Sequence, residues 1–489
     1  MKKLLACVLS VLLVMSLMAC GGDPETGAAE AGGQKGGTNT TLKEGQLLVG
    51  YGKVNITPEL AVPLAGYGNT ETRISQGFYD YLYATCFAVT DQDGNTAILF
   101  GIDMTGTGVT LYSKARQEIS NKYNIPMESI VISASHTHSA PDMGNTKVPT
   151  IPKWAPQLQS LLVECADMAM EDRAPADLYT TLTMTENLNF IRRYKISDGT
   201  VCGYISWINL FGYEVVGYES EPDRSLRLLK FDREEKPDIM VANFQTHPHR
   251  GGSASNTLMT ADLVGAFRTK VEEKLGYQVV YFTGAAGNIN PSSIIDEDNV
   301  TKDFKEQGQA LAQYAIDADG TYEKINGGTV RSTVRNFAAE IDHSEDHLLS
   351  VAREANELWN KTNDIPTVAK AYIPYGINGP YHAGAIISKA GQGKTNNFDI
   401  FAVSFGDVGF AVAPYEMFDT NGTFIKENSP FPVTFVAECA NGSNGYFPSE
   451  LAWDNHGYEV DTCKYKKGTA EDLADNYVEM LTELYNETK

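Results

Sequence analysis

"SIVISASHTHSAPD", residues 129–142, is the stretch that indicates both the fold and a site. Its first part, 129–134, is a short and largely apolar run of the kind that forms a buried strand. His136 and His138 follow where this run ends. In an extended strand, residues two apart point to the same face. Because imidazole is the commonest metal ligand and an acid/base near neutral pH, the stretch predicts a site at a strand end; the alternative is two polar residues in a solvated turn.

Strand-like and helix-like segments alternate along the rest of the chain. The expected strands are 47–54, 83–89, 96–102, 238–245 and 278–282, and the expected helices are 113–123, 158–172, 261–275, 305–318, 344–362 and 470–485. This alternation favours an α/β fold with a mixed central sheet and flanking helices. No second linker or repeat interrupts it, so we expect a single large catalytic domain with insertions. In such sheets, ligands gather at the carboxyl ends of strands.

The N-terminus predicts export and attachment to a membrane. Met1 to Lys3 is a short basic start, an apolar run follows, and Leu17 to Cys20 resembles a bacterial lipobox. We therefore predict a lipoprotein signal peptide over 1–20, lipidation of Cys20 and a location at the bacterial cell surface; the alternative is ordinary secretion with a chance cysteine. Residues 21–45, rich in Gly, Thr, Glu and Ala, predict a flexible tether, and 46–489 the folded domain.

Charge and cysteine usage exclude some classes of protein. The formal net charge of −23 argues against nucleic acid as a partner, since binding it requires concentrated Lys and Arg. The five cysteines after Cys20 are too sparse for a disulfide scaffold and lack CxxC metal spacing. Cys439 and Cys463 could pair outside the cell, which the sequence alone does not decide.

Other polar groups also follow apolar runs. His247 lies just past such a run in "VANFQTHPHRGG", and another run ends in the Gly/Ala loop 284–287. Small residues in that loop would allow a close approach to the backbone, and its amides could face an anion; a plain tight turn is the alternative. Glu416 is expected at the start of a helix, where a lone Glu is usually a cap or a dipole partner. A later Gly/Asn/Ser-rich stretch holds Tyr446 and Tyr458.

A rival histidine pair is less favourable. His343 and His347 lie four apart in "DHSEDH", but there is no HExxH pattern, and Ser344 is the expected helix cap. We interpret this pair as a solvated helix start. The remaining single histidines carry no clear signal: His249, His382 and His456.

Nine segments together resemble the neutral/alkaline non-lysosomal ceramidase family. They are "GYGKVNITP", "SASHTHSAPD", "NFIRRY", "ANFQTHP", "TADLVGAF", "GAAGNINP", "APYE", "NGSNGYFPS" and "GYE", in the order found in that family, from about Gly50 to Tyr465. The HTHS element with a later THP and a PxE is the specific part. The resemblance covers the N-terminal catalytic domain only, because the chain has one short acidic helix where the family continues into an immunoglobulin-like domain.

The resemblance implies a zinc ion. In that family the ion is held by two histidines, a glutamate and a tyrosine, which correspond here to His136, His247, Glu416 and Tyr446. Such donors are chemically suited to zinc and leave room for water. A catalytic zinc lowers the pKa of its water and polarises a carbonyl.

The resemblance also implies catalytic roles beside the metal. His138 would act on the water or the leaving amine, Arg192 would stabilise the oxyanion, and Tyr458 would line the same pocket. The loop 284–287 has no serine where the family carries one, which favours metal-activated water, and Tyr415 replaces a usual glycine.

Three functions are consistent with these observations. The leading one is a surface-anchored zinc amidohydrolase that cleaves an N-acyl bond in an amphiphile or a small amide. A zinc hydrolase of another ester or small amide is the second. A lipoprotein that binds a ligand without turnover is the third, although a binder has no need of four metal ligands and a carbonyl clamp.

Overall fold

The computed structural model describes residues 42–68, 70–295 and 303–487. The predicted signal peptide and lipobox over 1–20, and most of the tether over 21–45, lie outside these ranges. Residues Leu42–Lys489 form one compact unit. Among the helices in the described ranges, none combines the length and the apolar character needed to cross a membrane.

Two sheets form the centre of this unit. The larger has nine strands in the order β14 (Gln278–Thr283), β12 (Ile239–Phe244), β11 (Ser225–Arg233), β6 (Ala174–Met184), β1 (Leu47–Asn55), β3 (Tyr83–Thr90), β4 (Thr96–Ile102) and β5 (Ile130–Ala134), with β16 (Glu323–Ile325) beside β6. The smaller has β17 (Val330–Glu340), β18 (Thr395–Phe405), β19 (Val408–Val412) and β21 (Val433–Ala437). The β12–β14, β4–β5 and β19–β21 pairs are parallel, and the other pairs in these sheets are antiparallel. The mixed sheet that we predicted is therefore confirmed.

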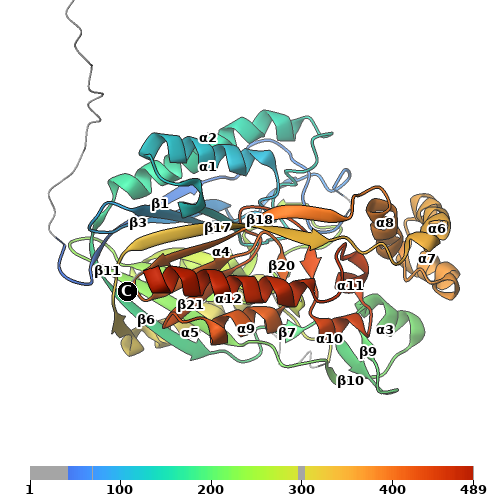
Figure 1. Ribbon diagram of the computed structural model, residues 1–489. Coiled ribbons are helices and arrows are strands. Elements are labelled where there is room, and N and C mark those ends of the chain that lie inside the picture. Colours follow the sequence, from blue (N-terminus) through green and yellow to red (C-terminus); the bar gives the residue numbers. More distant parts are fainter. Residues whose placement is uncertain (1–41, 69, 296–302, 488–489) are drawn as a thin grey trace, which may run out of the picture. The chain divides into compact units, whose positions relative to one another are not determined.

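The two sheets pack face to face and are covered by helices on their outer faces. Alternate residues of β3 show this: Phe87 and Val89 enter the core between the sheets, whereas Cys86 and Ala88 enter the core under the helices. Helices α1 (Thr110–Tyr123), α2 (Thr150–Glu171), α4 (Asp262–Leu275) and α5 (Phe304–Asp317) cover the larger sheet, and α9 (Asp419–Asn428) and α12 (Thr469–Glu487) cover the smaller one. Figure 1 shows α1 and α2 on one side of the sandwich and α9 and α12 on the other.

Close packing of α2 on β1 explains two glycines of the "GYGKV" segment. A Cβ atom on Gly50 or Gly52 would lie 2.0 Å from the carbonyl oxygen of Ala169 or Cys165, which no real contact allows. A larger residue at either position would push the helix off the sheet.

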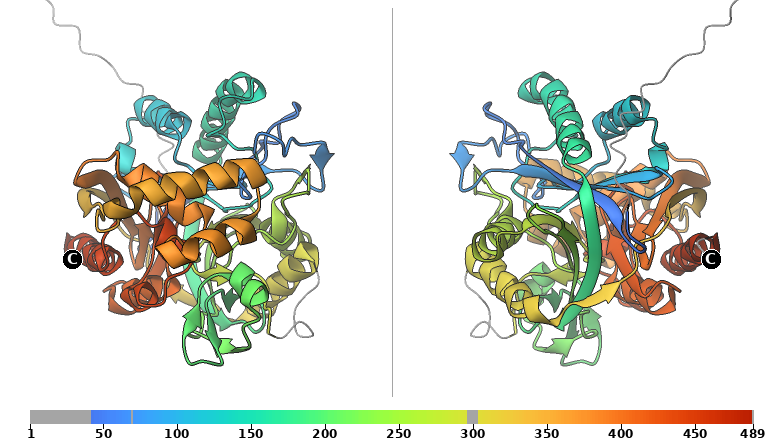
Figure 2. Two further views of the ribbon diagram at one scale, coloured as in Figure 1. Left: turned by 90° about the vertical axis from the view of Figure 1, so that its right-hand side faces the viewer. Right: turned by 90° about the vertical axis from the view of Figure 1, so that its left-hand side faces the viewer.

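Three further helices stand at one end of the sandwich with their own small core. They are α6 (Leu349–Thr362), α7 (Ile365–Tyr372) and α8 (Pro380–Lys389), and they face the viewer in the left view of Figure 2. The predicted cap at Ser344 is wrong, because α6 begins at Leu349 after a short 3-10 turn. Ser344 and Glu345 both precede this turn. The carboxylate of Glu345 instead contacts His382, whose Nε2 lies 2.9 Å away.

Candidate metal centre

His136 is held in an unusual backbone conformation directly after β5. Its φ of +68° lies in the left-handed region, which non-glycine residues seldom adopt outside functional or constrained sites. Its N–H donates to the carbonyl of Met104 (2.9 Å). The strand therefore ends at Ala134. The prediction that His136 and His138 lie on one face of an extended strand is wrong, because both residues follow the strand. The two rings meet nonetheless, because the turn brings their Nε2 atoms to 3.3 Å.

His247 comes from the parallel pair β12–β14, at the opposite end of the strand order of the larger sheet from β4–β5. It follows the end of β12 at Phe244 and is completely buried. Its Nδ1 lies 2.8 Å from the carbonyl oxygen of Ala286 and 3.0 Å from that of Ile289, both in the segment after β14. His247 thus follows the end of β12, and the segment after β14 fixes the orientation of its ring.

Glu416 and Tyr446 come from the side of the smaller sheet. They are paired residues on two short parallel strands, β20 (Glu416–Met417) and β22 (Tyr446–Phe447), so their side chains share one face. The predicted helix start at Glu416 is wrong: α9 begins only at Asp419, and Glu416 N–H donates to Gly445 (3.0 Å).

The small loop 284–287 lets this second pair approach the histidines. Gly287 N–H donates to the carbonyl of Met417 (2.7 Å), and a Cβ atom on Gly287 would lie 2.9 Å from that same oxygen. The loop therefore receives the backbone of β20, and Ala286 N–H faces the buried carboxyl group of Glu438. We predicted that small residues in this loop would allow a close approach to its backbone. This is confirmed, and the group that approaches is strand β20 of the same chain.

Three side-chain atoms converge between the sheets. Glu416 Oε2 lies 3.2 Å from the Nε2 atoms of both His136 and His247. Since the Nδ1 atom of His136 lies 2.6 Å from the carbonyl of Thr105, and that of His247 also faces carbonyls, each Nδ1 must carry the proton. Burial disfavours a charge on His136, but Cys439 and Glu416 outweigh it and raise the pKa of that ring well above its ordinary value. Without a cation, a proton on His136 Nε2 therefore faces the carboxylate, while the neutral His247 directs an Nε2 lone pair at it. A single proton can bridge only one of these nitrogens to the carboxylate, whereas a divalent cation can bind both nitrogens and the carboxylate together. This donor set therefore fits a metal ion.

The electrostatics of the group agree with a cation site. Burial raises the pKa of Glu416, but His136 and His247 outweigh it and hold that pKa well below its ordinary value. Burial and the charge of Arg192 lower the pKa of His247 to about 3, so its ring is neutral. Burial and the nearby Glu416 raise the pKa of the Tyr446 phenol well above its usual value. A phenolate at Tyr446 therefore requires a cation beside it.

His138 completes a group of three histidines. The ligand atoms of His136, His138 and His247 all lie within 4.8 Å of one another. His138 therefore lies as close to His136 and His247 as a metal ligand would. The family resemblance, by contrast, does not count His138 among the ligands. Burial and the neighbouring imidazoles lower its pKa well below the ordinary value. Gly66 makes room for it, because a Cβ there would lie 2.4 Å from the Cβ of His138.

Arg192 and Tyr458 border the same group. The Arg192 guanidinium lies 5.4 Å from the centre of the Tyr446 ring, and its Nη2 donates to the carbonyl of Gly287 (2.6 Å). Its Nε is paired with Glu459 at 2.6 Å, and this carboxylate is nearly inaccessible to solvent. The Tyr458 ring lies 5.7 Å from that of Tyr446. All seven predicted site residues are therefore in one region, joined through Arg192 and Tyr446.

A cavity of about 450 Å³ opens beside these residues. Arg192 and Tyr458 line it together with His249 and Asn290. The His249 ring lies 5.5 Å from that of His138 and 5.8 Å from that of His247, and its Nε2 lies 3.1 Å from Asn290 Oδ1. His249 carried no clear signal as a single histidine in the sequence. Its position two residues after His247 was the signal that could have identified it.

The cysteines near the site remain unpaired. Cys439 and Cys463 are both buried and free, so the disulfide that the sequence left open is not formed. The Cys439 sulfur lies 3.4 Å from His136 Nδ1, and the Cys439 carbonyl accepts from Ala134 N–H (3.2 Å). The segment that follows β21 of the smaller sheet is therefore hydrogen-bonded to the end of β5, just before His136.

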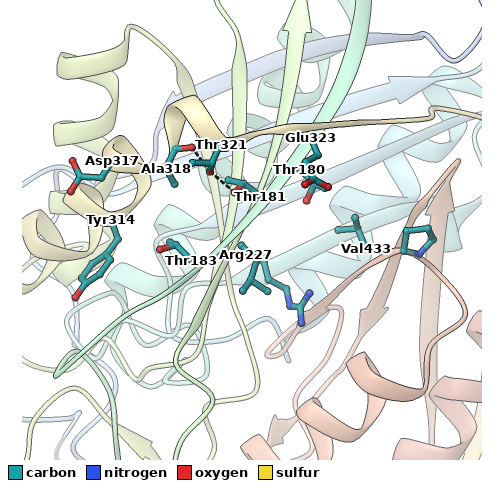
Figure 3. Close-up of a pocket in the computed structure, with 12 residues that line it drawn as sticks. Thr180, Thr181, Thr183, Arg227, Tyr314, Asp317, Ala318, Thr321, Glu323 and Val433 are labelled. Atoms are coloured by element: carbon teal, nitrogen blue, oxygen red, sulfur yellow. Dashed lines mark hydrogen bonds between the residues drawn. The ribbon is translucent and has the colours of Figure 1, made fainter.

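A larger cavity of about 670 Å³ lies apart from this group (Figure 3). It is bordered by β6, β11 and α5, with Thr181 and Arg227 among its lining residues, and Thr181 is hydrogen-bonded to Thr321 (2.8 Å). None of the predicted site residues line it, and its lining includes no histidine. We therefore place the candidate site in the smaller cavity, next to the group of three histidines.

Comparison with known proteins identifies the family. The sequence profile described as neutral/alkaline non-lysosomal ceramidase, N-terminal, matches residues 47–293, half of the chain. The chain belongs to this ceramidase family. No curated protein matches it closely enough to count as a relative. Among the site residues, His136, His138, Arg192 and His247 fall inside the matched range.

Two solved ceramidases share the fold. A ceramidase complexed with C2 aligns with a TM-score of 0.67 and 16% identity, over 91% of this chain and 76% of that one. The neutral ceramidase from Pseudomonas aeruginosa aligns with a TM-score of 0.68 and 17% identity, over 91% of this chain and 75% of that one. At this identity the likeness establishes the fold, which confirms the α/β architecture predicted from the sequence.

Proposed function

We propose that this chain of the ceramidase family is a zinc-dependent amidohydrolase that cleaves an N-acyl bond with a water molecule. The observation that carries the proposal is the convergence of the Nε2 atoms of His136 and His247 on the Glu416 carboxylate, 3.2 Å from each, at the edge of a cavity. Family membership supports a hydrolase, and the donor types support zinc over magnesium or calcium, which prefer oxygen ligands.

The ion would be held by His136, His247, Glu416 and Tyr446. When bound, it would supply Lewis-acid polarisation of the scissile carbonyl and activation of water. The carbonyls of Thr105 and Ala286 would fix the two rings by accepting their Nδ1 protons, which is the usual support for a metal-bound histidine.

His138 would transfer the protons of the reaction. Its neutral imidazole can accept a proton from the attacking water and return it to the nitrogen of the leaving amine. Burial among other imidazoles keeps it neutral. Arg192 would orient the substrate carbonyl and stabilise the negative charge that develops on its oxygen, and Tyr458 would contact the substrate from the opposite wall.

We also propose that the enzyme acts at the bacterial cell surface. The support is the sequence of its first twenty residues, which ends in a lipobox-like Leu17 to Cys20. A lipid on Cys20 would attach the catalytic domain to a membrane through the following Gly- and Thr-rich segment.

The test is hydrolysis of a panel of N-acyl amides and matched esters, with and without a chelator. We expect release of the free amine, loss of activity on chelation and recovery with added zinc. Turnover of esters alone would favour the second function, and binding without turnover of any member would favour the third. Activity that persists in metal-free protein would remove the zinc from the proposal.

A further inference from the structure

The cavity beside the histidines has a lining rich in tyrosine. Among the described residues that line it, two isoleucines are the only long aliphatic side chains, and there is no leucine, valine, methionine or phenylalanine. Four tyrosines line it: Tyr67, Tyr204, Tyr381 and Tyr458. The volume of about 450 Å³ is that of a site for a small molecule. A site for an alkyl chain would present flexible aliphatic walls, so this lining indicates another kind of group.

The tyrosine rings are fixed in position. Tyr381 and Tyr458 meet edge to face, with centroids 5.4 Å apart and planes at 85°. Tyr204 stacks on Trp207 at 4.6 Å, and its hydroxyl donates to the buried Asp461 (2.6 Å). These contacts orient three of the four rings that line the cavity. A pre-formed aromatic wall favours a flat ligand, because little side-chain entropy is lost on binding.

Among the residues that the structure describes, none brings a free charge to the cavity. Its two ionic side chains, Arg192 and Glu459, are paired with each other at 2.6 Å. The Nε2 atom of His249 faces the side-chain oxygen of Asn290 at 3.1 Å. A carboxylate or an ammonium group in the cavity would lose its hydration without an ionic partner. The part of the substrate that enters it is therefore uncharged.

We propose that the substrate of this enzyme carries an uncharged aromatic ring, joined to the scissile amide by a short linker, and that this ring occupies the tyrosine-lined cavity. The proposal rests on the amidohydrolase function proposed above and specifies its substrate class. Aromatic rings at 4.5–7 Å prefer edge-to-face or offset packing, and one such pair is worth about two- to tenfold in an equilibrium constant beyond simple burial. Tyr381 and Tyr458 offer this packing to a third ring.

The decisive comparison uses amides of similar size. Phenylacetyl and hexanoyl amides of one amine, and acetyl amides of benzylamine and hexylamine, separate a ring from a chain on each side of the bond. We expect kcat/KM to favour the aromatic member of at least one pair by about tenfold. Equal or better turnover of both alkyl members, or a steady gain with each added methylene, would overturn the proposal.

Variants of one tyrosine assign the preference to the cavity. Tyr381→Leu should reduce the aromatic preference by about two- to tenfold, whereas Tyr381→Phe should keep it. Tyr375→Leu is the matched control, because Tyr375 is 63% exposed and does not line the cavity. An unchanged preference in Tyr381→Leu, or an equal loss in the control, would show that the preference arises elsewhere.

A binding measurement separates this proposal from the proposed function. If no amide is hydrolysed, the hydrolase function fails, and the cavity is then tested by ligand-observed NMR with phenylacetamide and hexanamide. Preferential binding of phenylacetamide that Tyr381→Leu weakens and Tyr375→Leu does not would support the aromatic site by itself. Equal binding of the two amides would overturn it, whatever the outcome of the activity assays.

Discussion

His136 Nε2 and Glu416 Oε2 lie 3.2 Å apart, although their side chains are delivered by the two different sheets. His136 follows the last strand of the larger sheet, and Glu416 lies on a short strand after β19 of the smaller one. Neither sheet contains the whole donor set. An ion at this position would therefore connect the two halves of the sandwich and stabilise the native arrangement of both.

The first prediction is that one metal ion stabilises the fold. Purified protein should contain about one zinc per chain, and a chelator should lower both its activity and its melting temperature. A ligand present at a hundred times its dissociation constant stabilises a protein by about 2.7 kcal/mol. Metal analysis and thermal melts with and without chelator measure this. His247→Ala is the control, since it should lack metal and show no further response to the chelator. Unaltered melting of the native protein after complete metal removal would contradict the prediction.

The second prediction separates His138 from the metal ligands. His138→Ala should keep about one zinc per chain but lower kcat by at least about a hundredfold, because a positioned acid/base contributes about 10² to 10⁴ in rate. His136→Ala should lose metal and activity together. If His138 only supports the loop, kcat should fall less than about tenfold while the melting temperature drops. Loss of zinc from His138→Ala would instead make this residue a ligand, as the spacing of the three histidines allows.

The sequence was informative where one local rule applied. Strands such as 83–89 and 278–282 were predicted to within a residue or two of their observed ends. Short apolar runs bounded by turn residues are typical of buried strands. The predicted site rested on two signals. His136 and His247 each followed such a run, and parallel strand ends are where ligands gather. The family resemblance implied the roles of the others, such as Arg192 and Tyr446, which the structure places in the same region.

The sequence was misleading where distant contacts decide the local conformation. A left-handed residue at His136 depends on its hydrogen bond to Met104, on another strand end. Glu416 occupies a strand because Gly445 and Tyr446, some thirty residues later, pair with it. Neither partner is visible in a short window of sequence. The pairing of Arg192 with Glu459 and the place of His249 were missed for the same reason.

The third prediction concerns the buried pair of Arg192 and Glu459. Removing one member leaves an uncompensated charge in the interior, which usually costs about 3–5 kcal/mol. Glu459→Ala should therefore lower the free energy of unfolding by about that amount and displace the Arg192 guanidinium. Urea denaturation measures the first effect and kcat/KM the second. Glu71→Ala is the control, because its pair with Lys147 is exposed and should be worth far less. Equal effects of the two substitutions would contradict the prediction.

The fourth prediction concerns attachment. Cys20→Ala should release the protein from the membrane fraction or block its maturation, while the domain from Leu42 onward stays folded. Once the predicted signal peptide is removed, lipidation of Cys20 is the source of membrane affinity that the sequence predicts. Fractionation of cells that express the two forms, with a melting curve for each, measures this. Membrane association that is unchanged in Cys20→Ala would remove the proposed anchor.

The fifth prediction is a pH dependence of stability that arises at Asp262. This residue has a φ of +57° and is completely buried. Burial raises the pKa of its carboxyl group to about 7, and the nearby Asp80 adds to this, although N–H donors from Gly251 and Leu263 oppose it. Its ordinary value, which applies in the unfolded chain, is 3.8.

The sign follows from proton binding. Between about pH 4 and pH 7 the folded carboxyl group keeps its proton while the unfolded one has lost it, so the folded state binds more protons. The contribution of Asp262 to stability is therefore complete at low pH and decreases as the pH rises through this window, at most by about 1.4 kcal/mol per pH unit. Asp262→Asn cannot titrate, and Asn tolerates the left-handed backbone. Urea denaturation at several pH values should thus show the native protein losing stability relative to Asp262→Asn from about pH 4 to pH 7, with no further change above. Parallel pH profiles for the two proteins would show that this carboxyl group titrates normally in the fold.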